Sequence, residues 1–497
     1  MIDPTTPRAR GHGINHHVGL KRPHLRALLA AATLVAALLA ATGDAGAAQR
    51  PLATAIQDFD YTATHFDRVR GAGARTVKLV FPWRRIAPDV RPADFDPANP
   101  DDPRYDWSPY DDQIRVAVAR GLEPLITTEQ APLWAERGTD GPVATRDPDP
   151  AEFGAFGTAI ARRYSGTQAG LPRVRLFEAW NEPNASFFLS PPYVNGQPNT
   201  PHLYRTLVNS FSAGVHGVHG DNVVIAGAQF PFVINRPSAV SVGPYRFMRD
   251  VLCLSEQLKT LPNCGPPLAA DVWSHHPYTS GGPTHRASNR DGISLGDMLK
   301  MKRALNAAIK QGRFASSRPV AFWVTEFGWD SAPSDPKGVP LQLHARWVSE
   351  ALYRMWGAGV SLVTWYRLRD GPPDGPVQSG LWFRCANGIA CDSPKSSSLK
   401  AFRFPFVAFR SGKGRVRVWG RTPDATGAKV AVERSRKGKW RTLRTLRAGS
   451  NGVFRKRIRG PRRGSIRARV VASGEASVGF SLKRPPDMPV NPFGSSS

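Results

Sequence analysis

Two glutamates, Glu182 and Glu326, each follow an apolar run of sequence that is typical of a buried β-strand. Glu182 stands in Leu-Phe-Glu-Ala-Trp-Asn-Glu-Pro (176–183), and Glu326 stands in Ala-Phe-Trp-Val-Thr-Glu-Phe-Gly (321–328). Two carboxyl groups can together cleave a glycosidic bond. One stays protonated and donates to the leaving oxygen, while the other is ionised and attacks the anomeric carbon. These two glutamates are our candidates for that pair.

The residues beside Glu182 fit this interpretation. Pro183 favours an extended backbone at Glu182, which would fix the glutamate where the strand stops. Asn181 carries an amide that could hydrogen-bond a sugar hydroxyl. The alternative is an Asn-Glu-Pro turn that caps a helix. The preceding strand and the second glutamate favour the catalytic interpretation.

Eight strand-like runs alternate with amphipathic helical stretches between residues 51 and 405. This alternation predicts a (β/α)8 barrel with enlarged loops, in which the strand ends carry the site. A doubly wound open sheet is the second possibility, but no Gly-rich phosphate loop follows the first strand. We expect helices over 111–120, 152–163, 201–216, 295–311 and 342–356. We expect strands over 53–59, 76–81, 122–127, 175–180, 223–228, 271–274, 320–325 and 361–365.

With these strands in order, the chain resembles the clan A retaining β-glycosidases and is most similar to glycoside hydrolase families 5 and 39. In that clan the acid/base follows an asparagine at the end of strand four, and the nucleophile ends strand seven. The resemblance therefore implies that Glu182 is the acid/base and Glu326 the nucleophile of a double displacement. Glu178, four residues earlier, is expected to be a hydrogen-bonded structural carboxylate. No metal, nucleotide or redox cofactor is expected.

The resemblance also implies a set of substrate-binding residues. The segment Trp-Ser-His-His-Pro-Tyr (273–278) is similar to the clan's His-x-Tyr element. His276 would line the sugar site, and the Tyr278 hydroxyl would hydrogen-bond the nucleophile. Trp365, at the eighth strand, is similar to the aromatic floor under the sugar. After the second strand the clan has an arginine five residues before a tryptophan. Here Lys78 precedes Trp83, and lysine lacks the planar fork that can hold a carboxylate through two bonds.

The first 47 residues have the three parts of a secretory signal peptide: a basic region, an apolar region at 27–42 and a small-residue cleavage site, Ala-Gly-Ala, at 45–47. The apolar region has 16 residues, and a membrane span needs about 20. An uncleaved anchor is the alternative. We expect a secreted or surface-attached protein with no transmembrane span in the mature chain. The basic residues are Arg8, Arg10, Lys21, Arg22 and Arg26.

The four cysteines form two close pairs in the sequence, Cys253 with Cys264 and Cys385 with Cys391. In an oxidising compartment such neighbours would close two small loops, so we expect two disulfides. A metal site is the competing use of these cysteines. It lacks the Cys-x-x-Cys or histidine spacing that zinc sites have.

Past residue 410 the chain alternates apolar and polar residues in short runs at 414–420, 428–434 and 464–471. These runs predict a small antiparallel β-sandwich over 411–484, followed by a disordered tail over 485–497. Residues 401–486 hold 24 Lys and Arg against 3 acidic residues, which is +21 of the chain's net charge of +28. A concentrated positive face attracts polyanions such as anionic cell-wall polymers. A merely solvated sheet face is an equally open interpretation.

Taken together, these features predict a secreted, monomeric retaining glycoside hydrolase that cleaves β-bonds in a polysaccharide or oligosaccharide. Nucleic acid is not expected as a partner, because the basic domain has no recognition helix or nucleic-acid motif. The alternative is a catalytically silent carbohydrate- or cell-wall-binding protein built on a glycosidase barrel. Its signature would be the loss of one of the two glutamates, and both are present.

Overall fold

The computed structural model describes residues 50–492, apart from residues 374, 376 and 425–426. Eight parallel strands close into a barrel, and the eighth strand pairs with the first. The predicted (β/α)8 barrel is confirmed, and the closure rules out an open doubly wound sheet. All eight strands lie where the sequence predicts them. In chain order they are β1 (Ala53–Gln57), β2 (Thr76–Pro82), β3 (Glu123–Glu129), β4 (Leu176–Ala179), β7 (Val223–Gln229), β10 (Val272–His275), β11 (Ala321–Val324) and β14 (Leu362–Tyr366).

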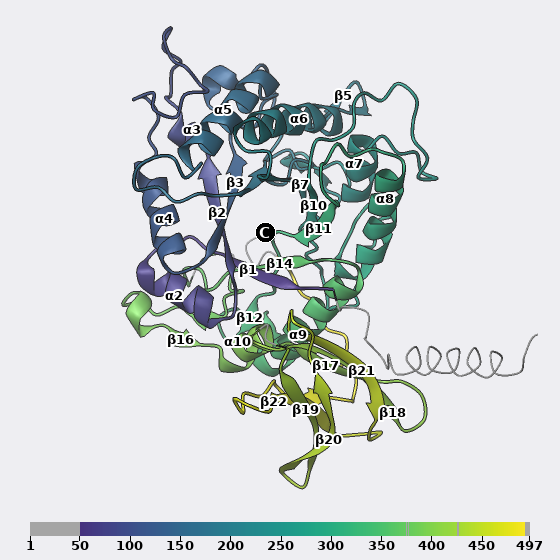
Figure 1. The fold of residues 1–497 in the computed structure, drawn as a ribbon. Helices are drawn as coiled ribbons and strands as arrows, with labels where there is room; N and C mark the ends of the chain where they lie inside the picture. The colour runs from purple at the N-terminus through teal and green to yellow at the C-terminus, as the bar shows by residue number, and fades with distance from the viewer. Residues whose placement is uncertain (1–49, 374, 376, 425–426, 493–497) are drawn as a thin grey trace, which may run out of the picture. The chain divides into compact units, whose positions relative to one another are not determined.

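Helices cover the outside of the barrel (Figure 1). The five predicted helices are confirmed as α4 (Ser108–Ala119), α5 (Pro150–Arg163), α6 (Thr200–Val218), α8 (Met298–Lys310) and α9 (Leu341–Gly357). Four further helices are not among those predicted: α2 (Ala63–Gly71), α3 (Trp83–Ile86), α7 (Pro244–Val251) and α10 (Ser396–Arg403). Each of these four is nine residues or shorter, too short for a repeated apolar period to stand out.

Helix α5 shows how local sequence sets these elements. Its N-cap, Asp149, accepts hydrogen bonds from the backbone N–H groups of Ala151 and Glu152, and proline occupies the first helical position. Helix α6 then packs closely on α5 because Gly214 has no side chain. A Cβ at Gly214 would collide with the carbonyl oxygen of Gly154. Helix α6 in turn contacts β4, the strand that leads to Glu182, because the Tyr204 hydroxyl donates to the Ala179 carbonyl oxygen at 2.9 Å.

The barrel interior changes from apolar to polar along the strands. Near the strand starts, a small apolar cluster is formed by Leu125, Leu176, Ile225 and Val272. Side chains two residues apart on a strand point the same way. The next inward layer therefore contains the completely buried polar residues Thr127, Glu178 and Ser274. One further step reaches Glu129 and His276 at the strands' carboxyl ends. This edge is where parallel barrels carry their sites.

The chain after the barrel forms two antiparallel sheets. One contains β17 (Phe406–Arg410), β18 (Arg415–Arg421) and β21 (Val453–Arg459). The other contains β19 (Lys429–Arg436), β20 (Lys439–Arg447), β22 (Ser465–Val470) and β23 (Phe480–Ser481). The predicted β-sandwich is confirmed, and its first strand begins before residue 411. Its buried core includes Trp419, Val430, Val432 and Ile466.

Several contacts join the sandwich to the barrel helices. The ring of Tyr353 in α9 lies 5.5 Å from the ring centroids of both Phe409 and Trp419. Arg403 pairs with Glu475 at 2.8 Å. Further along, Val490 donates its backbone N–H to the carbonyl oxygen of Ser280 at 3.0 Å. Residues 485–492 thus run against the barrel, within the segment for which the sequence predicts disorder.

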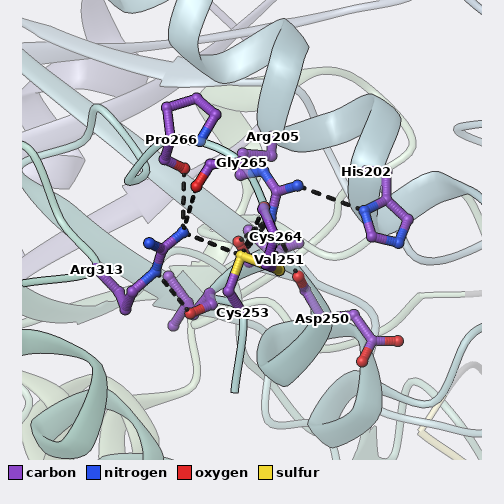
Figure 2. The surroundings of a disulfide bond; sticks show 10 residues. His202, Arg205, Asp250, Val251, Cys253, Cys264, Gly265, Pro266 and Arg313 are labelled. Carbon is purple, nitrogen blue, oxygen red and sulfur yellow. Dashed lines mark hydrogen bonds between the residues drawn. A yellow bond between two sulfur atoms is a disulfide. The ribbon is translucent and has the colours of Figure 1, made fainter. Parts of the chain in front are cut away.

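Both predicted disulfides are present, Cys253–Cys264 and Cys385–Cys391, each with Cα atoms 5.7 Å apart. Figure 2 shows two guanidinium groups directed at the first of them. Arg205 and Arg313 donate to the Sγ atom of Cys253 at 2.8 and 3.0 Å. The bridge therefore ties the loop after α7 to residues from α6 and from the segment after α8.

The predicted signal peptide, residues 1–47, lies outside the described residues, as do residues 493–497. Within the described part of the chain, no helix has both the length and the apolar character required to cross a bilayer.

Candidate active site

Glu182 is held by a tightly folded backbone just past the end of β4. Trp180 and Glu182 have φ angles of 72° and 42°, in the left-handed region that residues other than glycine rarely adopt. The expectation of an extended backbone at Glu182 is therefore wrong. The N–H of Glu182 donates to the carbonyl oxygen of Ala228, and its own carbonyl accepts from Ala185. These bonds outweigh the preference imposed by Pro183 and fix the carboxyl group at the barrel mouth.

Glu326 lies two residues past the end of β11, and two neighbouring side chains stabilise its ionised form. The hydroxyl of Tyr278 donates to Oε1 at 2.8 Å. The ammonium group of Lys78 lies 3.9 Å from Oε2. Burial raises the pKa of Glu326, whereas Lys78 and the Tyr278 hydrogen bond oppose that rise. The predicted contact between Tyr278 and Glu326 is present in the structure.

His276 joins the two halves of the site. Its Nδ1 lies 2.9 Å from Oε1 of Glu182, and its Nε2 lies 3.2 Å from the Thr325 hydroxyl. Burial, with Lys78 as the second cause, lowers the pKa of His276 well below its usual value. The imidazole is therefore neutral at pH 7 and brings no positive charge to Glu182. Burial first, and then the charge of Glu326, raises the pKa of Glu182 well above the usual range.

Glu182, His276 and Glu326 converge on one point. Each offers an atom, and these three atoms lie within 4.8 Å of one another. Two carboxylates and an imidazole could in principle bind a divalent cation. However, Lys78 already places a positive charge 3.9 Å from Glu326, and it would repel a metal ion there. The arrangement suits proton transfer and nucleophilic attack better than metal binding.

Lys78 lies beneath the site and is completely buried. Its Nζ is 3.1 Å from Oε2 of Glu178. Glu178 also accepts hydrogen bonds from the hydroxyls of Thr127, at 2.8 Å, and Ser274, at 3.0 Å. Glu178 is thus the hydrogen-bonded carboxylate that the sequence predicts. The predicted substrate contact of Lys78 is not supported, because its ammonium group is enclosed between two glutamates.

Replacing Lys78 with methionine is expected to reduce stability by about 3 to 5 kcal/mol at pH 7, because Glu178 would remain as a buried, unpaired charge. Thermal and denaturant unfolding would measure the loss. The K78M/E178Q double variant removes both charges and should recover much of the stability. Lys78 also opposes the rise in the pKa of Glu326, so that pKa should rise further in K78M. Equal stability of K78M and the wild-type protein would contradict the buried pair.

The two tryptophans predicted to bind substrate are covered by protein. Trp83 is 0% exposed and stacks on Phe156, with ring centroids 5.4 Å apart. Trp365 is 1% exposed, and its indole N–H donates to the Ser379 carbonyl oxygen. Neither indole has an open face, so neither can stack on a sugar ring as predicted. Asn181 lies beside Glu182 and is 9% exposed.

Glu129 contributes a third carboxyl group at the barrel mouth, and the sequence motifs do not single it out. It is the last residue of β3 and is 9% exposed. Burial raises its pKa to about 7, with Lys78 lowering it and Glu326 raising it further. The alternation of side chains along a strand could have indicated this residue, because Thr127 and Glu129 are two residues apart and share a face of β3. The strand predicted from the sequence ends at residue 127, two residues short of Glu129.

The chain is similar in fold to solved structures of other proteins, although its sequence is not similar to theirs. No protein-family model and no curated protein sequence matches the chain. Among solved structures, a family 39 glycoside hydrolase from Bacteroides cellulosilyticus is 16% identical, with a TM-score of 0.50, over 83% of this chain and 81% of that one. This chain shares the fold of that glycoside hydrolase. The fold resemblance predicted from the sequence is therefore confirmed.

Two further structures are more distant from the chain. SrfJ from Salmonella typhimurium is 10% identical, with a TM-score of 0.46, over 84% of this chain and 91% of that one. A family 30 endoxylanase from Clostridium papyrosolvens is 10% identical, with a TM-score of 0.44, over 83% and 95% of the two chains.

Proposed function

We propose that this protein is a retaining glycoside hydrolase that cleaves β-linked O-glycosidic bonds in an oligosaccharide or polysaccharide. The meeting of Glu182 and Glu326 at the ends of the fourth and seventh barrel strands carries the proposal. Their nearest ligand oxygens lie within 4.8 Å. Retaining pairs lie about 5 to 5.5 Å apart, whereas inverting pairs lie about 6.5 to 9.5 Å apart to admit a water molecule. Oxygens this close place both carboxyl groups within reach of one anomeric carbon, and the retaining course rests on the resemblance of the two glutamate motifs to clan A.

The surroundings of each glutamate suit its proposed role. Tyr278 and Lys78 both favour the ionised form of Glu326, so one of its oxygens can attack the anomeric carbon. The bond to the leaving oxygen breaks, and that oxygen takes the proton of Glu182. Water then attacks the anomeric carbon, gives its proton to Glu182 and releases Glu326. Burial beside the neutral His276 keeps Glu182 protonated for the first step.

The stereochemistry of hydrolysis tests this proposal. The purified protein should hydrolyse at least one member of a panel of aryl β-glycosides of glucose, xylose, galactose, mannose and glucosamine. Proton NMR of the first-formed sugar should then show the β-anomer, before mutarotation sets in. The α-anomer as first product would exclude the retaining mechanism. No hydrolysis across the panel and across common β-glucans and xylans would favour the silent carbohydrate-binding alternative.

We also propose that the protein works outside the cell, as a monomer. The two disulfides support an oxidising compartment, because such bonds rarely persist in the cytosol. The charge pattern before the apolar region at 27–42 supports export through a cleaved signal peptide.

The sandwich is proposed to hold the enzyme on an anionic cell-wall polymer. Of its three acidic residues, Glu433 already pairs with Arg467 and Arg469 at 2.9 Å. The basic side chains of β20 and β21 are exposed, including Lys439, Arg441, Arg444, Arg455 and Arg457. Retention on cell-wall material should weaken steeply between low and high salt, since charges are screened over about 10 Å at 0.1 M ionic strength. Co-sedimentation at two salt concentrations measures this, and salt-independent retention would contradict it.

A further inference from the structure

A cavity of about 540 Å³ opens at the mouth of the barrel, and Glu182 and Glu326 are not among its lining residues. It lies over the carboxyl ends of β1, β2 and β3, which are neighbours in the barrel. Phe59, from the segment after β1, and Glu129, from the end of β3, both line it. We call this space the β1–β3 cavity. None of the residues predicted from the sequence to bind substrate lines it.

Glu129 is the unusual group in this cavity. It is 9% exposed, and its carboxyl group has no hydrogen-bond or ion-pair partner among the residues that the structure describes. Neither of its carboxyl oxygens is among the fully buried polar atoms of the described residues that lack a hydrogen-bond partner, so the carboxyl group is open to the cavity that Glu129 lines. Glu129 also lies close enough to Lys78 and Glu326 for their charges to shift its pKa. It therefore connects the cavity with the reacting centre.

The cavity also provides an aromatic surface. Phe59 is 48% exposed. Its ring meets the edge of Tyr366 at a centroid distance of 6.2 Å, and the guanidinium group of Arg367 lies 5.1 Å from its centre. Arg367 is itself held by Asp58 at 2.9 Å. Phe59 is thus a supported ring that stays open to the solvent, whereas Trp83 and Trp365 are closed.

We propose that the β1–β3 cavity binds the sugar ring that Glu326 attacks, with Glu129 accepting hydrogen bonds from the hydroxyls of that ring and Phe59 packing against its apolar face. A carboxylate can accept from two neighbouring hydroxyls at once, and an aromatic ring covers the C–H face that a pyranose exposes. The proposal rests on the proposed function and adds a residue that decides which sugar is accepted. Uncharged pyranosides should be preferred over uronides, because Glu129 and Glu326 would repel a second carboxylate.

The test compares Glu129→Ala with Glu123→Gln. Glu123 lies at the other end of β3, is exposed and pairs with Arg175, so it serves as the matched control. On the best aryl β-glycoside of the panel, E129A should lower kcat/KM about 10- to 100-fold, the range of a lost hydrogen bond to a charged group. E123Q should stay within about 2-fold of the wild-type protein. Thermal melts of both variants check that they fold.

A second measurement separates the attacked sugar from the leaving group. With 2,4-dinitrophenyl glycosides the leaving group departs easily, so release of the sugar from Glu326 becomes the slow step. Only the attacked sugar is present in that step. E129A should slow it as well, and an effect confined to the first step would overturn the proposal. An unchanged kcat/KM in E129A would overturn it too, while leaving the proposed hydrolase activity intact.

Binding gives a readout that does not depend on turnover. Isothermal titration of the methyl β-glycosides of the same sugars into the wild-type protein should show binding that E129A weakens by the same factor. If the wild-type protein hydrolyses nothing but binds these sugars through Glu129, the function fails and the cavity assignment stands. If no sugar binds, or if E129A binds as well as the wild-type protein, the cavity assignment fails.

Discussion

Replacing Glu326 with glutamine should lower turnover by at least about 10⁴-fold while leaving the fold intact. The amide has nearly the same shape and can still accept the hydrogen bond that Tyr278 donates to Oε1 at 2.8 Å. It cannot attack the anomeric carbon, so no glycosyl-enzyme forms. Burial raises the pKa of Glu326, which means that the ionised carboxylate weakens the folded state at neutral pH. The amide removes that cost.

Two measurements separate a lost nucleophile from a damaged fold. Thermal melts at pH 7 should show E326Q to be about as stable as the wild-type protein. Mass spectrometry after treatment with a 2-fluoro glycoside should find the label on the peptide that contains Glu326 in the wild-type protein, and no label in the variant. Glu256→Gln is the matched control, since Glu256 is exposed and pairs with Arg290 at the surface. Activity of E326Q within a few-fold of wild type would remove Glu326 from its role.

The candidate pair could be predicted from sequence because both glutamates close strands with strong local patterns. Apolar, β-branched and aromatic residues before each glutamate mark a buried strand, and counting strands gives the order of the barrel. The expectations for His276 and Tyr278 come from the resemblance of residues 273–278 to the clan's His-x-Tyr element. The structure brings all four together, although they are separated by up to 144 positions in the chain. Strand order alone determines that proximity.

The parts that could not be predicted depend on packing between distant segments. Trp83 and Trp365 lie at strand ends, but α5 covers one of them and the segment around Ser379 covers the other. A sequence pattern shows that a residue is aromatic, not whether another element lies on its face. The backbone at Glu182 was predicted wrongly for a similar reason. Its hydrogen bond to Ala228 comes from the next strand in the barrel and outweighs the local effect of proline.

Lys78 illustrates a further limit of the sequence. Lys78 stands where the clan has an arginine, and the resemblance predicts that it contacts substrate. In the structure it neutralises Glu178 below the site and stands near Glu326. Its role follows from the inward direction that β2 gives to its side chain, together with the two carboxylates from β4 and β11. No single segment of sequence contains that information.

Replacing Glu182 with alanine should give an effect that depends on the leaving group. Glycosides with poorly acidic leaving groups need the proton that Glu182 supplies, and their kcat/KM should fall by about 10² to 10⁴-fold. Glycosides of acidic phenols leave without that proton, so their first step should be nearly unchanged. Water then attacks the glycosyl-enzyme slowly, because no base is present.

Azide and pH provide the deciding readouts for Glu182→Ala. Azide needs no base, so it should attack the glycosyl-enzyme, restore turnover and yield a β-glycosyl azide. Burial and the charge of Glu326 raise the pKa of Glu182, so the wild-type rate should fall as pH rises through that raised pKa and the carboxyl group loses its proton. This basic limb should disappear in E182A, whereas the acid limb set by Glu326 should remain.

The same raised pKa means that ionised Glu182 destabilises the fold at high pH, so E182A should lose less stability than the wild-type protein between pH 5 and 9. An unchanged basic limb, or no rescue by azide, would assign the proton transfer to another group, and Glu129 would be the first to examine.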